Sequence, residues 1–245
     1  MAAHLFRAAN SLVAFTGAGL STPSGIPDFR SPHSGMWEKS DPMTVASIFG
    51  FRQNPQAFYN WVRPLARLTM DAQPNPAHFA LARLEALGKL KSVITQNIDM
   101  LHERAGNHKI YELHGHLREA TCIHCFKVYP AKPILERFME DGIVPLCREC
   151  GGILKPNVIL FGEQLPIRQL QGAREAVRNC DLLIVLGSSL EVAPASDLPV
   201  MAKQAGAKLI IINLEKTHLD SMADLVIHAD VAEAMPAILA LLETE

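Results

Sequence analysis

Residues 12–19 read LVAFTGAG, an apolar and β-branched run that ends in a glycine-rich turn. Runs of the same kind, without a polar face, recur five times along the chain. They are residues 92–95 (SVIT), 158–161 (VILF), 182–186 (LLIVL), 208–213 (KLIIIN) and 225–228 (LVIH). Strands of a parallel sheet that is covered on both faces have this composition, so we expect all six runs to be buried parallel strands.

Segments with helical spacing of apolar residues separate these runs. Strands that alternate with helices predict the α/β class, with a doubly wound parallel sheet that carries helices on both faces. Two stretches break the alternation, at 31–70 and 120–155, and we expect them to form a smaller inserted lobe. The larger lobe then comprises residues 1–30, 71–119 and 156–245. The helical segments are 76–87, 98–105, 167–178, 196–205 and 232–242.

The composition excludes some classes of partner. The chain has 245 residues, of which 49% are hydrophobic, and a formal net charge of −2. This charge gives no reason to expect direct nucleic-acid binding. No apolar run reaches the roughly 20 residues that a membrane-spanning helix requires. Because Arg7, Asn10 and Ser11 interrupt the apolar start of the chain, we expect no signal peptide, no membrane contact and a cytoplasmic location.

Four of the five cysteines form two CxxC pairs, with 21 residues between the pairs. In a reducing compartment such pairs bind a metal more often than they form disulfides. Each short knuckle presents two sulfurs, so two knuckles can hold one Zn²⁺ in tetrahedral coordination. Four thiolates leave no open position, which predicts a structural zinc. The alternative is one redox pair beside a coincidental one. The predicted ligands are Cys122, Cys125, Cys147 and Cys150.

The glycine-rich turn differs from the turn of a classical dehydrogenase. Gly17, Ala18 and Gly19 directly follow the first apolar run, where backbone amides can approach a phosphate. Thr22 occupies the place of the third glycine in the dehydrogenase pattern, and residues 23–30 (PSGIPDFR) contain two prolines that oppose a helix. A dehydrogenase would begin its phosphate-binding helix here, whereas this chain begins a loop long enough to fold over a ligand.

Polar residues follow four of the apolar runs. The carboxyl ends of parallel strands meet at one edge of the sheet, where ligands bind in open α/β folds. Each set of polar residues could instead cap the following helix, but their occurrence at a common edge favours a binding site. Glu215 is placed to accept hydrogen bonds from a ribose diol. The sets contain Gln96, Asn97, Asp99, Gly187, Ser188, Ser189, Asn213, Glu215, Asp230 and Val231.

His114 ends the segment 109–114, directly before the stretch that holds the paired cysteines. Imidazole titrates near neutral pH and is suited to general-base catalysis. A lone histidine is as often a structural hydrogen-bonding residue. The pattern by itself leaves both interpretations open.

Seven motifs occur in a characteristic order. They are residues 17–30 (GAGLSTPSGIPDFR), 95–99 (TQNID), 114–115 (HG), the two CxxC pairs, 158–163 (VILFGE), 187–194 (GSSLEVAP) and 211–215 (IINLE). In these motifs and their order the chain resembles the sirtuins, the NAD-dependent protein-lysine deacylases, over nearly its whole length. Leu20 in place of the usual isoleucine and Ser188 in place of the usual threonine are mild departures from the family pattern.

The resemblance implies a Rossmann-like lobe, a small lobe with structural zinc, and NAD in the cleft between them. It implies that Phe29 shields C1′ of the ribose after nicotinamide leaves, and that Ile98 and Asp99 hold the nicotinamide carboxamide. The implied NAD contacts are Gly17, Ala18, Gly19, Thr22, Asp28, Phe29, Arg30, Gln96, Asn97, Ile98, Asp99, His114, Gly187, Ser188, Ser189, Asn213, Leu214, Glu215 and Val231.

The reaction implied by the resemblance is glycosyl transfer, not hydride transfer. The acyl-lysine oxygen attacks C1′ of NAD as nicotinamide departs. His114 acts as the general base toward the ribose hydroxyls, and Asn97 is the second catalytic residue. The products are free lysine, nicotinamide and O-acyl-ADP-ribose. The implied contacts to an acyl-lysine protein or peptide are Tyr59, Val158, Phe161, Gly162, Glu163, Glu191 and Val192.

The acyl group can be inferred from one further comparison. Sirtuins that prefer succinyl or malonyl lysine carry a tyrosine and an arginine three residues apart. Here Tyr59 is present, but Val62 takes the arginine position and Arg63 follows one residue later. One residue turns a helical side chain by about 100°. We therefore expect an apolar acyl group such as acetyl.

Two other functions stay open from the sequence. A mono-ADP-ribosyltransferase would use the same NAD site with a protein nucleophile in place of acyl-lysine. A non-catalytic NAD-sensing or zinc-ribbon interaction module would have no need for His114, Asn97 and Asp99 together, and it is disfavoured for that reason.

Overall fold

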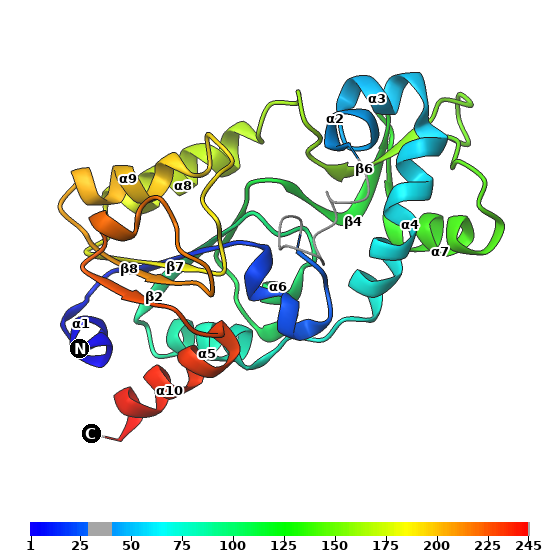
Figure 1. Cartoon of the computed structure of the whole chain (residues 1–245). Helices are drawn as coiled ribbons and strands as arrows, with labels where there is room; N and C mark the ends of the chain where they lie inside the picture. Colours follow the sequence, from blue (N-terminus) through cyan, green and yellow to red (C-terminus); the bar gives the residue numbers. More distant parts are fainter. Residues whose placement is uncertain (29–40, 245) are drawn as a thin grey trace.

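The computed structural model describes residues 1–28 and 41–244. Its larger part is a parallel sheet of six strands in the order β3-β2-β1-β7-β8-β9 (Figure 1). This order confirms the predicted doubly wound fold, because the chain adds strands on one side of β1 and then on the other. The strands are β1 (Leu12–Thr16), β2 (Leu90–Thr95), β3 (Ile110–Glu112), β7 (Leu182–Leu186), β8 (Lys208–Ile212) and β9 (Leu225–Ile227).

Helices cover both faces of this sheet, as its apolar strands require. On β1, Leu12 and Ala14 pack into one hydrophobic cluster with α1, α5 and α10. Val13 and Phe15 point the other way, into a second cluster with α8 and α9. Every residue of β1 is buried, and so is every residue of β7. The helices are α1 (Ala2–Ala8), α5 (Pro76–Ala86), α8 (Ile167–Arg178), α9 (Asp197–Gln204) and α10 (Val231–Glu243).

The smaller part of the molecule is built around an antiparallel sheet in the order β5-β4-β6, with helices packed beside it (Figure 1). Its separate core contains an aromatic group in which the Tyr59 ring lies 5.4 Å from that of Phe58 and 4.8 Å from that of Phe138. Its elements are α2 (Pro42–Val45), α3 (Ile48–Gln53), α4 (Pro55–Asp71), β4 (Gly115–Cys122), β5 (Val128–Pro130), α7 (Ala131–Asp141) and β6 (Leu154–Val158).

Two predicted elements differ in the structure. The run 158–161 is not a strand of the parallel sheet, since β6 ends at Val158 and pairs with β4 of the small sheet. Its apolar residues belong to the core and cavity wall of the smaller part, a burial that sequence pattern alone does not distinguish from a buried strand. The helix expected from residue 98 begins later, as α6 (Leu101–Ala105), because Met100 directly before it has φ of 62°, outside the helical region.

Among the described residues, no helix combines the length and the apolar character that crossing a bilayer demands.

A pair of buried histidines lies behind the carboxyl end of β1. The rings of His78 and His102 are 5.0 Å apart, and the Thr16 hydroxyl lies 3.0 Å from Nε2 of His102. Nδ1 of His78 accepts from the Asn75 amide, which identifies His78 as a neutral ring. Burial lowers the pKa of His78 to about 4. Burial and the neighbouring His78 hold the pKa of His102 well below its ordinary value.

We expect the free energy of unfolding to fall as the pH drops below about 6.5, the pKa of histidine in an unfolded chain. Both folded-state pKa values are depressed, so the pair stabilises the native state fully above that pH and progressively less below it. With a folded pKa of about 4, His78 alone loses about 2 kcal/mol of stabilisation between about pH 7.5 and about pH 5. Urea denaturation at the two pH values measures the loss.

Two variants isolate the effect. His78→Gln should show a weaker pH dependence than the native chain, whereas His4→Gln changes an exposed side chain and should leave the dependence as it is. An identical pH dependence in the native chain and in His78→Gln would contradict the prediction.

Candidate active site

The carboxyl ends of the parallel strands open into one cavity of about 880 Å³, with the smaller part of the molecule forming its other wall. Of the predicted NAD and substrate contacts, Phe29 and Arg30 lie outside the described residues. All the others except Tyr59 line this cavity. The structure therefore brings together residues that are far apart in the sequence, most of which follow the predicted strands.

Two glycine-containing loops meet where β1 and β7 end. The Gly19 amide donates to the Gly187 carbonyl at 2.8 Å, and the Gly17 amide donates to the Leu186 carbonyl at 3.1 Å. A Cβ at Gly17 would lie 2.8 Å from the Gly187 oxygen, and one at Gly187 would lie 2.2 Å from the Leu20 nitrogen. These glycines are needed because the two loops touch through their backbones. The Gly19 amide is used within the protein, so Gly19 helps to hold the two loops together, and its contact with NAD stays a prediction.

A chain of polar side chains crosses the floor of the cavity. The Ser21 hydroxyl donates to the Asp99 carboxylate at 2.7 Å. The side-chain amide of Asn97 donates to the Gly17 carbonyl at 3.0 Å and to the Ser21 hydroxyl at 3.1 Å. Asp99 is buried, and this burial raises the pKa of its carboxyl. Ser21 links Asn97 to Asp99, and we did not include it among the predicted contacts. Its place directly after a glycine-rich turn was the available signal.

His114 stands in the turn between β3 and β4. Its Nδ1 lies 3.0 Å from the Gln96 carbonyl, which can only accept, so Nδ1 carries the proton. In the neutral ring Nε2 then has the lone pair, the arrangement that a general base requires. The His114 carbonyl accepts from the Ile159 amide at 2.8 Å. Gly115 follows with φ of 78°, and a Cβ there would lie 2.0 Å from the Asn157 oxygen.

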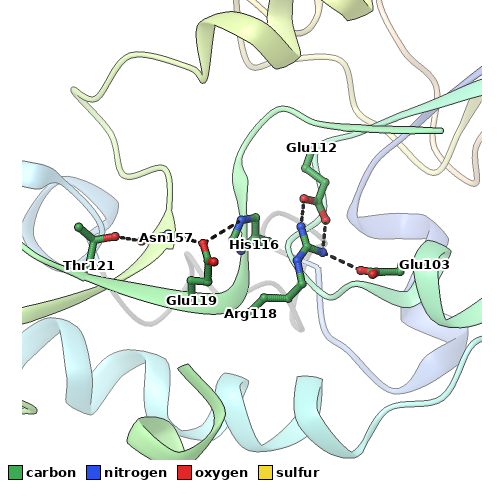
Figure 2. A network of polar contacts seen from close by, with 7 residues as sticks. All are labelled: Glu103, Glu112, His116, Arg118, Glu119, Thr121 and Asn157. Carbon is green, nitrogen blue, oxygen red and sulfur yellow. Dashed lines mark hydrogen bonds and ion pairs between the residues drawn. The ribbon is translucent and has the colours of Figure 1, made fainter. Parts of the chain in front are cut away.

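A surface network holds the strands on both sides of this turn (Figure 2). Arg118 on β4 forms a bidentate pair with Glu112 at the end of β3, and its Nη1 also donates to Glu103 of α6 at 2.8 Å. Figure 2 shows a second group in which Asn157 joins Thr121 and Glu119 of β4. The first group ties β4 to the parallel sheet, and the second ties β4 to β6.

One face of α4 closes the far end of the cavity with apolar side chains. They follow helical spacing, at Phe58, Trp61, Val62 and Leu65, and Thr69 extends the same face. Only Val62 was expected to bear on the acyl group, although the i, i+3, i+4, i+7 spacing on a helix was an available signal for the others.

Tyr59, which was expected to contact the substrate, does not line the cavity. Its ring is fully buried in the small core, and its hydroxyl donates to the Leu154 carbonyl at 2.6 Å. Arg63 also points elsewhere, since its guanidinium lies 5.6 Å from the centre of the Phe138 ring and donates to the Met139 carbonyl. The structure therefore gives Tyr59 a packing function, because its neighbour Phe58 occupies the helix face that meets the cavity.

The four paired cysteines form a compact cluster outside the cavity. Their sulfur atoms all lie within 4.8 Å of one another. The Cys122 and Cys150 sulfurs are 3.5 Å apart, and the Cys125 and Cys147 sulfurs are 3.6 Å apart. A tetrahedron with metal–sulfur bonds of about 2.3 Å has edges of about 3.8 Å, so the cluster fits one metal ion. Amides of the knuckle also lie against the Cys122 sulfur, as thiolate ligands require.

Comparison with known proteins agrees with this geometry. Residues 17–194 match the family model described as the Sir2 family. The chain belongs to the Sir2 family. It is 47% identical to NAD-dependent protein deacylase 2 of Archaeoglobus fulgidus, over 97% of this chain and 93% of that protein. It is 44% identical to the NAD-dependent protein deacetylase of Thermotoga maritima, over 90% of this chain and 89% of that protein.

Solved structures of the family superpose on the whole chain. A structure described as the basis for the mechanism and regulation of Sir2 enzymes has a TM-score of 0.93 and 46% identity, covering 99% of this chain and 96% of its own. A Sir2 complex with p53 peptide and NAD⁺ has a TM-score of 0.89 and 40% identity, covering 97% and 95%. The sirtuin resemblance of the sequence is thereby confirmed.

Proposed function

We propose that this Sir2 family member is an NAD-dependent protein-lysine deacetylase that transfers the acyl group to ADP-ribose. One observation carries the proposal. His114 holds a proton-accepting Nε2 at a cavity whose floor is polar, through Asn97, Ser21 and Asp99, and whose far wall is apolar. Such a cavity suits a nucleotide at one end and an apolar acyl-lysine at the other.

The named relatives support this reaction. Solved structures of the family include Sir2 bound to acetylated peptide, at 40% identity, and the complex with p53 peptide and NAD⁺. By analogy, the loops at Gly187, Asn213 and Glu215 would hold the adenosine half of NAD. The side-chain amide of Gln96 donates to the Ser188 hydroxyl at 2.9 Å, and its backbone carbonyl contacts His114. Gln96 therefore connects the adenosine side of the site to the side of His114.

The residues of this chain have distinct tasks in the proposed reaction. The Gln96 carbonyl keeps the His114 proton on Nδ1, so that Nε2 can take a proton from a ribose hydroxyl. The Asn97 side-chain amide is held at the polar floor of the cavity by its hydrogen bonds to Gly17 and Ser21. The apolar face of α4 excludes water from the acyl end. With the consumption of one water, acyl transfer to ADP-ribose would yield free lysine, nicotinamide and O-acyl-ADP-ribose.

We expect nicotinamide release from NAD that depends on an acetyl-lysine peptide, and loss of about 100-fold or more of this rate in His114→Ala, since general-base groups contribute about that much. His108→Ala is the matched control, because its side chain is 88% exposed and it should keep the native rate. A native chain that releases no nicotinamide in a peptide-dependent way would refute the deacylase proposal. Mass spectrometry distinguishes the alternative, an ADP-ribosyltransferase, by a mass increment on a protein.

We also propose a preference for apolar acyl groups over succinyl. The cavity wall at α4 presents Phe58, Trp61, Val62 and Leu65, and Arg63 is held against Phe138. An acyl carboxylate would lose its hydration at this apolar wall without a charged partner from α4, which is costly.

On matched peptides, kcat/KM for acetyl-lysine should exceed that for succinyl-lysine by about tenfold or more. The measurement is product formation by mass spectrometry at low peptide concentration. A succinyl rate above the acetyl rate would show that the apolar face of α4 does not disfavour an acyl carboxylate.

We propose that the four-cysteine cluster binds a structural Zn²⁺ within a smaller lobe. Zinc accepts four thiolates in tetrahedral geometry, and such a site has no open position for chemistry. Cys122 ends the strand that begins at Gly115, directly after His114, so the ion would stabilise the strand that follows the base. The unpaired cysteines of the described chain also agree with a reducing compartment such as the cytoplasm.

We expect about one zinc per chain, and its removal by a thiol-reactive reagent with a chelator should lower the melting temperature and reduce deacylation about tenfold or more. Cys150→Ser should have the same effect. Cys180→Ser is the control, because Cys180 is buried beside α8 and away from the cluster. Full deacylation by zinc-free protein would contradict a structural function of the metal.

A further inference from the structure

Residues 159–163, here called the rim segment, line the cavity directly after β6. Backbone hydrogen bonds hold the segment from two sides. The Ile159 amide donates to the His114 carbonyl at 2.8 Å, and the Phe161 amide donates to the Ala46 carbonyl at 2.9 Å. The Phe161 carbonyl in turn accepts from the Ile48 amide at 3.0 Å. The rim segment therefore connects the turn of the general base to the start of α3.

A nearly buried ion pair holds the rim segment from its third side. Nζ of Lys155 lies 3.0 Å from Oε2 of Glu163, and it also donates to the Val158 carbonyl at 2.7 Å and to the Pro156 carbonyl at 3.2 Å. The same Oε2 accepts from the Leu160 amide at 2.8 Å. The two side chains are only 12% and 22% exposed.

The direction of the Glu163 carboxylate changes the interpretation of this residue. We expected Glu163 to contact the substrate. One of its oxygens is occupied by Lys155 and by the backbone of its own segment. The ammonium of Lys155 in turn contacts three oxygens within residues 156–163. Both groups therefore close a loop of chain, and burial lowers the pKa of Lys155 while Glu163 opposes that effect.

The rim segment has little room to adopt another shape. Gly162 has φ of 86°, and a Cβ there would lie 3.1 Å from the Phe49 ring. A backbone held in this way presents its peptide groups at fixed positions, which pairing with an extended peptide requires. If the ion pair is removed, the backbone hydrogen bonds of Ile159 and Phe161 stay in place, as does the one from the Glu163 amide to the Leu160 carbonyl at 3.0 Å. The side chain of Glu163 then no longer ties this tight turn to Lys155 and β6.

We propose that Lys155 and Glu163 form a positioning pair that fixes the rim segment in the shape that binds the acyl-lysine peptide. The inference rests on the proposed deacylase function. The pair touches neither the glycine loops nor the polar floor of the cavity. Its loss therefore weakens the binding of the peptide and leaves the binding of NAD in place.

The experiment compares Lys155→Met, Glu163→Gln and Lys155→Arg with the native chain. For the first two variants, KM for acetyl-peptide and its Kd by fluorescence anisotropy should rise about tenfold, because the segment loses its pre-organised shape. KM for NAD should stay within about twofold. Lys155→Arg keeps the charge and should restore most of the peptide affinity.

Lys203→Met is the matched control. The Lys203–Asp224 pair has a distance of 2.8 Å and exposures of 25% and 19%, but neither residue lines the cavity. This variant should lower stability without changing either KM. If Lys155→Met does not fold, Glu163→Gln, which keeps the size of the side chain, decides the question.

Three outcomes would overturn the inference. They are an unchanged peptide KM in Glu163→Gln, an equal rise of both KM values, and the same change in Lys203→Met. The proposed function is tested separately, by the native chain alone. A native chain that binds NAD but never turns over acyl-peptide would refute that function.

Discussion

The site depends on the contact between the backbones that follow β1 and β7. These strands are neighbours in the sheet, and they flank the point where the chain order reverses. Both are buried along their whole length, so their ends cannot move apart. The loops must therefore pass within hydrogen-bonding distance, and Gly17, Gly19 and Gly187 leave no room for side chains. Ser21 and Ser188 are placed at the cavity as a result of this contact.

The smaller part of the molecule is connected to this contact through β4. Its strand begins directly after His114 and ends at Cys122 of the cysteine cluster. Gly115 lies so close to Asn157 of β6 that the two strands must separate before a side chain could fit there. The network around Arg118 closes the same region from the surface (Figure 2). A metal bound by this cluster would thus be linked to the turn of His114 through one continuous strand.

The sequence predicts five of the six strands of the parallel sheet, because these are apolar runs bounded by glycine or polar residues. It misses β3, whose three residues are only partly buried and include a glutamate. It predicts β1, β7 and α8 with their observed limits. It fails at residues 158–161, of which only Val158 belongs to a strand, β6 of the small sheet, while the others line the core and the cavity wall. It also fails at Tyr59, because the adjacent aromatic residues Phe58 and Tyr59 do not indicate which of them faces the cavity. That choice depends on the packing of α4 against α7 and β6.

The polar residues at the strand ends could either support the start of the following helix or organise a binding site. Asp99 does both. One of its oxygens accepts from the Leu101 amide and so begins α6, while the other accepts from Ser21 at the cavity floor. A carboxylate has two oxygens, so the hydrogen bond to the first residue of α6 leaves the second oxygen available to organise the site. Asp230 likewise caps α10 through the Ala232 amide while lining the cavity. Helix starts at this edge therefore fix the orientation of the side chains that the site uses, and the capping residues are part of its architecture.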